Sequence, residues 1–151
     1  MRIYTDTSVF GGYYDEEFAK WSRKLFVEFE EGLNTALISD ITLRELEDAP
    51  AKVRELLKRI PEENREYVSL GEEAKRLAIS YIEEGVVSNK NLIDAQHIAV
   101  ATIERVDVLV SWNFKQIVNL GKIRLYNGVN LKRGYPLLEI RSPKEVLREE
   151  V

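Results

Sequence analysis

The sequence predicts an α/β fold, a three-layer α/β/α sandwich with a central, mainly parallel sheet. Two short apolar runs, at 35–39 and 108–111, are typical of strands that are buried on both faces. Around them, apolar residues recur at the spacing of amphipathic helices. Alternating strands and helices favour a parallel sheet that is covered on both sides. The 151 residues contain no repeat or linker-like tract, so we expect one domain over 1–151.

The elements expected in the first half of the chain follow one another closely. In order they are a strand at 2–5, a helix from Asp15 to Gly32, a strand at 35–39, a helix that carries Leu43 and Leu46, and a helix at 50–60. Gly11-Gly12 predicts a turn before the first helix. Ser39 or Asp40 can cap the second helix, and Pro50 suits the first position of the third.

The second half continues the alternation of helices and strands. Its expected elements are helices at 72–84 and 91–105, a strand at 108–111, a partly helical segment to Gly134, a strand near 137–140 and a short final helix. The helix at 91–105 is apolar around most of its circumference, which predicts a central, buried position. Gly85 is an expected C-terminal glycine. Ser142 and Glu145 have the spacing of a capping box.

Composition excludes several kinds of site. The chain has no cysteine, and His97 is its only histidine, which excludes thiolate and multi-histidine metal sites. A bound metal would therefore need oxygen ligands, which favour magnesium, manganese or calcium. The net charge of -4 argues against a protein that coats nucleic acid, although a local basic patch remains compatible with it. With no signal-peptide pattern and no membrane-spanning run, we expect a cytoplasmic protein.

Acidic residues follow the expected strands at the edge where parallel sheets bind ligands. Asp6 ends the first strand, Glu45 lies in the helix after the second, and Asp94 lies in the first turn of the apolar helix. Each acid alone is explained by a turn, a solvated helix face or a cap. Together they would repel one another unless a cation neutralised them. A divalent metal there can bind a phosphate oxygen and lower the pKa of a water, which is the chemistry of phosphodiester hydrolysis.

Three motifs, in this order, resemble those of the PIN domain, and among its members the VapC-type toxins. They are Ile3-Tyr-Thr-Asp6-Thr-Ser8, Ser39-Asp-Ile-Thr-Leu-Arg-Glu45-Leu and Asp94-Ala-Gln-His97-Ile-Ala99. The segment Leu109-Val-Ser-Trp-Asn113-Phe114 looks like the one in which many members carry a fourth acid. Asn113 stands in the place of that acid, so the chain resembles a subgroup with Trp-Asn-Phe at this point.

The resemblance implies a magnesium- or manganese-dependent ribonuclease. Asp6, Glu45 and Asp94 would be the metal ligands, and Asn113 would complete the catalytic set. Because a carboxamide brings no negative charge, we expect one tight metal, with a second that arrives with RNA. A toxin of this type would form a homodimer and be held inactive by a small antitoxin protein.

Polar and aromatic neighbours of the acids have two interpretations each. Thr7, Ser8 and Ser111 can hydrogen-bond a ligand carboxylate or only shape the turns. His97 lies three residues after Asp94, so it can contact the site or pack in the core. Trp112 can stack on a base or pack behind the strand. Several cations can guide an RNA backbone or be solvated surface: Lys20, Arg23, Lys24, Lys115, Lys122, Lys132 and Arg133.

Three functions are compatible with this pattern. The first is hydrolysis of RNA by a metal-dependent endoribonuclease. The second is a catalytically weak PIN-like module that binds RNA or a protein partner without cleavage, an alternative that Asn113 motivates. The third is a phosphatase with Asp6 as nucleophile, but Ser8 stands where its second acid is expected.

Overall fold

Five parallel strands form one sheet in the computed structural model, which describes residues 1–148. The strand order is β3-β2-β1-β4-β5. The strands are β1 (Arg2–Thr5), β2 (Thr35–Ser39), β3 (Arg65–Val68), β4 (Val108–Val110) and β5 (Ile140–Arg141). Every neighbouring pair is parallel, so all carboxyl ends lie at one edge of the sheet.

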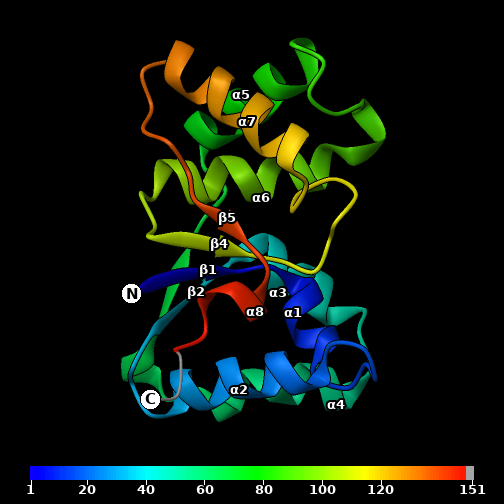
Figure 1. Cartoon of the computed structure of the whole chain (residues 1–151), viewed down its shortest axis with the longest axis vertical. Coiled ribbons are helices and arrows are strands. Elements are labelled where there is room, and N and C mark those ends of the chain that lie inside the picture. The colour runs from blue at the N-terminus through cyan, green and yellow to red at the C-terminus, as the bar shows by residue number, and fades with distance from the viewer. Residues whose placement is uncertain (149–151) are drawn as a thin grey trace.

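Helices cover both faces of this sheet, which confirms the predicted α/β/α sandwich (Figure 1). One layer contains α5 (Glu72–Glu83), α6 (Leu92–Ile103) and α7 (Leu120–Lys132), and the other contains α1 (Thr7–Gly12), α2 (Ala19–Glu30), α4 (Ala51–Arg54) and α8 (Pro143–Val146). Helix α3 (Asp40–Glu47) continues directly from β2. Within residues 1–148, no helix combines the length and the hydropathy that a membrane crossing requires.

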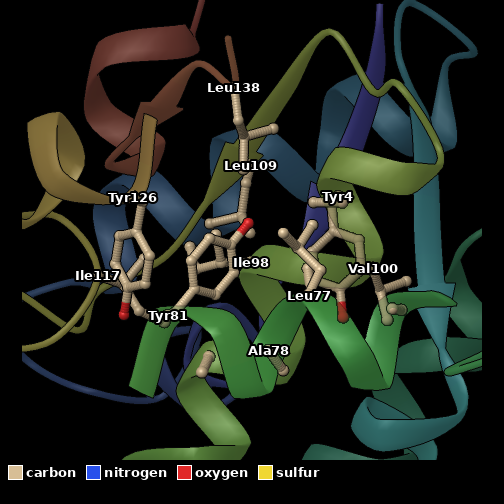
Figure 2. Close-up of a cluster of buried hydrophobic side chains, with 14 of the residues drawn as sticks. Tyr4, Leu77, Ala78, Tyr81, Ile98, Val100, Leu109, Ile117, Tyr126 and Leu138 are labelled. Atoms are coloured by element: carbon tan, nitrogen blue, oxygen red, sulfur yellow. The ribbon is translucent and has the colours of Figure 1, made fainter. Parts of the chain in front are cut away.

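Alternate residues of the strands point into two separate cores, as the period of a strand requires. Tyr4 of β1 and Leu109 of β4 belong to the core beneath α5 and α6, whereas Ile3 and Val110 belong to the core beneath α2. Figure 2 shows Tyr4, Leu109 and Tyr81 of α5 among the side chains of the first core. A shift by one residue would turn every strand side chain to the wrong core, so burial fixes the register.

This register places the ends of the two central strands together. Thr5 pairs with Val110, and the Asp6 N–H donates to the Val110 carbonyl at 3.1 Å. Asp6 and Ser111, which follow these residues, therefore lie side by side at the carboxyl edge.

Gly11-Gly12 was expected to form a turn, and this expectation is wrong: both residues lie in α1. Gly12 is required by close packing, since a Cβ there would lie 2.6 Å from Trp112 Nε1 and 2.8 Å from Ser22 Oγ. Gly12 thus permits the close approach of an indole, a property that local sequence does not encode.

The helix expected at 50–60 is also different in the structure. Helix α4 covers only Ala51–Arg54, with Pro50 as its N-cap, and a 3₁₀ segment follows at Glu55–Arg59. Pro61 explains the end, because the residue before a proline is disfavoured in the helical conformation, and Ile60 is extended.

Strand β3 was not expected, and β5 begins later than predicted. Arg65–Val68 is an edge strand in which only Val68 is buried, so it lacks an alternating apolar pattern. Leu137 is 61% exposed and precedes β5.

Two expectations are confirmed: Ser39 caps α3, and Ser142 forms a capping box with Glu145 at α8.

Candidate metal centre at the strand ends

The structure brings Asp6, Glu45 and His97 into one cluster at the carboxyl edge of the sheet. One carboxylate oxygen from each acid and a ring nitrogen of His97 all lie within 4.8 Å of one another. Asp6 follows β1, Glu45 lies on α3 and His97 lies on α6. Three elements that are distant in the sequence thus supply one group of potential ligands.

Two serine hydroxyls hold the Asp6 carboxylate in place. Ser8 and Ser111 donate to Asp6 Oδ2 at 2.8 and 2.7 Å. Backbone N–H groups hold the serines in turn, since Trp112 N donates to Ser8 Oγ and Asn113 N donates to Ser111 Oγ. The Asp6 side chain is only 9% exposed, and its other oxygen, Oδ1, lies 3.3 Å from His97 Nε2.

His97 connects the two acids with the buried core. Its Nε2 lies 2.8 Å from Glu45 Oε1, and its Nδ1 lies 2.7 Å from the Tyr4 hydroxyl. That hydroxyl donates to Ser39 Oγ, so its oxygen is available to accept from a protonated Nδ1. Burial disfavours the charge on the imidazole, but the Asp6 and Glu45 carboxylates outweigh burial and raise the pKa of His97. The protonated ring carries a positive charge between two acids.

Glu45 forms the open side of the cluster. Its side chain is 39% exposed. Thr7 Oγ1 donates to Glu45 Oε1 at 2.8 Å, the same oxygen that His97 contacts. Burial alone would raise the pKa of Glu45, but the hydrogen bonds from His97 and Thr7 outweigh it and lower that pKa. Glu45 is therefore an ionised carboxylate that is reachable from solvent.

Asp94 lies next to this cluster and is paired with Asn113. Asn113 Nδ2 donates to Asp94 Oδ1 at 3.2 Å. Asn113 Oδ1 accepts from the backbone N–H groups of Lys115 and Gln116 at 3.2 and 2.9 Å. These donors turn the amide oxygen toward the backbone, so Asn113 presents its NH₂ group, not its oxygen, to the acids. Burial and then the Asp6 charge raise the pKa of Asp94, because both disfavour its ionised form.

Trp112 packs behind the site. Its ring stacks on Phe18 at a centroid distance of 4.2 Å, and its Nε1–H donates to Ser22 Oγ at 2.9 Å. The indole is 8% exposed, which favours the packing interpretation over stacking on a base. Its backbone N–H holds Ser8, so this indole anchors the loop that orients Asp6.

Sequence reasoning missed the role of Tyr4, whose hydroxyl orients His97. A tyrosine between Ile3 and Thr5 in a predicted buried strand was the available signal, because a buried phenol needs a partner. His97 was considered for both contact with the site and packing in the core. It does both, since it is 1% exposed and reaches two acids.

The donors present fit a divalent cation. Carboxylate oxygens suit magnesium and manganese, and an imidazole nitrogen is compatible with manganese and later transition metals. A hydrogen bond from His97 Nδ1, the second ring nitrogen, to the Tyr4 hydroxyl is the kind of outer contact that orients metal-binding histidines. Asp6, Glu45 and His97 form the compact donor group, and Asp94 adds a further carboxylate within electrostatic reach.

No protein-family model matches the sequence, and no curated protein matches it either. The structure is similar to a chain in the crystal structure of VapBC2 from Rickettsia felis bound to a DNA fragment from their promoter. The TM-score is 0.53 at 18% sequence identity, and the match covers 94% of this chain and 98% of the other. The five-stranded parallel sheet and its flanking helices are therefore a fold that this chain shares with that structure, consistent with the predicted PIN-like fold.

Proposed function

We propose that the chain is a divalent-metal-dependent endoribonuclease of the PIN type. The observation that carries this proposal is the cluster of Asp6, Glu45 and His97, with Asp94 beside it, at the carboxyl edge of a parallel sheet. Parallel sheets bind their ligands at this edge. The VapC-like fold supports the choice of RNA hydrolysis among the reactions that such a cluster can perform.

The proposed cofactor is Mg²⁺ or Mn²⁺, held by Asp6, Glu45 and Asp94, with His97 within reach as a nitrogen donor. Such an ion supplies a positive charge for a phosphate oxygen and lowers the pKa of a water molecule. Without it, Asp6 and Glu45 raise the pKa of His97, and the protonated ring neutralises charge between the two acids. Binding of a metal ion in the site therefore competes with protonation of the His97 ring.

The remaining polar side chains keep the acids oriented. Ser8 and Ser111 hold one oxygen of Asp6 so that the other faces the cluster. Thr7 restrains Glu45, and Asn113 restrains Asp94. These four residues are positioning groups in the proposal, because each touches an acid and none supplies a carboxylate of its own.

Cleavage of a labelled single-stranded RNA tests the proposal. We expect cleavage with Mg²⁺ or Mn²⁺, none after chelation, and none with Asp6→Asn or Asp94→Asn. Asp107→Asn is the matched control, since Asp107 precedes β4 and accepts from the Arg2 N–H at the opposite edge of the sheet. Equal cleavage by wild type and Asp6→Asn would exclude the proposed site.

A specific observation favours a second candidate, a module that binds RNA or a protein without cleaving. Asn113 provides no fourth carboxylate, and its amide oxygen is occupied by two backbone N–H groups. Calorimetric titration with Mn²⁺ separates the candidates. Binding that Asp94→Asn abolishes supports the enzyme, whereas no binding at millimolar Mn²⁺ supports the module.

The proposal extends to partners and location. Because the similar structure is a VapBC2 complex, we propose that a small antitoxin protein holds this chain inactive. We also propose that the chain forms a homodimer and acts in the cytoplasm. Co-expression with the product of an adjacent short reading frame, followed by co-purification, tests the antitoxin. Light scattering of the purified chain tests the dimer.

A further inference from the structure

A groove of about 510 Å³ lies between α2 and α8 on the layer that also packs against Trp112. Its principal lining residues are Lys20, Trp21, Lys24, Lys144, Leu147 and Arg148. Figure 1 shows α8 above α2, with α2 running beneath the sheet. None of the strand-end acids lines this groove, so it is separate from the candidate metal centre.

The groove is positive although the chain as a whole carries a net charge of -4. Within residues 1–148, Lys20, Lys24 and Lys144 form no ion pair. Lys20 and Lys24 are four residues apart on α2, a spacing at which like charges repel. The acid in the groove, Glu28, is 8% exposed and accepts from Asn34 Nδ2 and the Arg148 N–H. A polyanion would relieve this repulsion.

Trp21 forms an aromatic surface among these cations. Lys20 Nζ and Lys144 Nζ lie 5.7 and 5.0 Å from its ring centroid. A ring flanked by ammonium groups at this distance can stack on a nucleobase while the lysines contact the adjoining phosphates. This combination distinguishes the groove from a surface that attracts anions by charge alone.

A row of aromatic rings connects this groove with the metal centre. Trp21 lies 6.3 Å from Trp112, and Trp112 lies 6.1 Å from Phe114, measured between ring centroids. Phe114 is 49% exposed and directly follows Asn113, whose amide donates to Asp94. Phe114, beside the acids, and Trp21, in the groove, thus lie on either side of the buried Trp112.

We propose that the groove binds the single-stranded RNA that extends from the cleavage site, with a base on Trp21 and phosphates on Lys20, Lys24 and Lys144. This inference rests on the proposed ribonuclease function, because that function supplies the RNA. Charge, the half-buried ring of Trp21 in the groove lining and the aromatic connection to the acids favour RNA over an acidic protein segment, which would need the cations but not the stacking surface.

Binding in chelator tests the groove without cleavage. For a fluorescein-labelled 12-nucleotide RNA, we expect the Lys20→Glu/Lys144→Glu variant to bind at least ten-fold more weakly than wild type. The slope of log affinity against log salt should also decrease. Trp21→Ala should weaken binding with little change in slope, and RNA should no longer quench the tryptophan emission. Lys75→Glu, on α5 in the opposite layer, is a control for charge reversal of a single lysine outside the groove and should bind as wild type does.

Cleavage kinetics separate this inference from the proposed function. In the groove variants, KM for the 12-nucleotide RNA should rise while kcat stays unchanged, and cleavage of a dinucleotide should be unaffected. If RNA is cleaved but the groove variants bind and cleave like wild type, the groove assignment is overturned and the ribonuclease stands. If they weaken binding but no RNA is cleaved, the groove stands and the ribonuclease fails. A third result would also overturn the assignment: poly-L-glutamate displaces the RNA, and Trp21→Ala binds RNA as tightly as wild type does. That result would favour an acidic protein partner.

Discussion

Two polar networks in the described part of the molecule differ in charge: one is charged and the other is neutral. The charged network joins Asp6, Glu45 and His97 at the sheet edge. The neutral one lies between α5, α6 and α7, where the Tyr81 hydroxyl donates to Asn130 Oδ1 and Asn130 Nδ2 donates to Thr102 Oγ1. The neutral network satisfies its members internally, so its role is structural. The charged network gathers acids that repel one another, an arrangement that favours a cation.

Substitution of Asp6 should separate activity from stability. Asp6→Asn keeps the side-chain size and acceptor for Ser8 and Ser111 but removes a charge. We expect RNA cleavage to fall by about 100-fold or more, while the free energy of unfolding without metal stays within about 1 kcal/mol of wild type. Cleavage rates and urea unfolding measure both. A loss of stability as large as the loss of activity would show that Asp6 is mainly structural.

Substitution of Tyr81 should give the opposite result. Tyr81→Phe removes the hydroxyl and leaves the buried Asn130 oxygen without this donor. We expect a loss of about 1–3 kcal/mol in the free energy of unfolding and unchanged cleavage per folded molecule. Unfolding by urea and activity at a temperature below the transition check the prediction. Wild-type stability would mean that water satisfies Asn130 equally well.

Asn113→Asp changes a residue that lies beside the charged network and contacts Asp94. The change removes the amide donor to Asp94 and places a second carboxylate beside it. Metal-free stability should fall by about 1 kcal/mol, and Mn²⁺ affinity should rise by about tenfold because the added charge attracts the ion. Calorimetry with and without Mn²⁺ measures both. Unchanged affinity would place this side chain outside the reach of a metal.

The pKa of His97 gives the smallest effect and a direct view of the charged network. Since the two acids raise this pKa above 6.5, the protonated ring stabilises the metal-free fold below about pH 6.5, and this stability is lost as the pH rises through the folded-state pKa. Glu45→Gln should lower the pKa. Because His97 is the only histidine, its ring signals can be followed by NMR without assignment. A pKa below 6.5 in wild type would contradict the charged contact.

Periodic features of the fold were predictable from the sequence, whereas the edge strand β3 and contacts between distant elements were not. The buried runs of β2 and β4 and the apolar α6 follow from local patterns. Strand β3 does not, because an edge strand with one buried residue needs no apolar alternation. Gly12 resembles a turn residue, and only the approach of Trp112 explains it.

In the candidate site, too, the positions of the acids were predictable from the sequence, whereas the contacts that orient its side chains were not. Asp6, Glu45 and Asp94 were expected from their places after strands and at a helix start, and the structure places them around one edge. Their metal binding stays a prediction. That Asn113 turns its NH₂ group toward Asp94 could not be expected, because the backbone N–H groups of Lys115 and Gln116 set its orientation. The contact of His97 with both acids depends likewise on Tyr4, which belongs to another element.

The central claim is that the charged network binds a divalent cation, and the His97 ring signals test it most directly. Paramagnetic Mn²⁺ broadens the signals of nearby protons. We predict that substoichiometric Mn²⁺ broadens the His97 ring signals in wild type and in Asp107→Asn, and that Asp6→Asn abolishes the broadening at the same concentration. Ring signals that stay sharp in wild type at millimolar Mn²⁺ would contradict a metal centre at this edge.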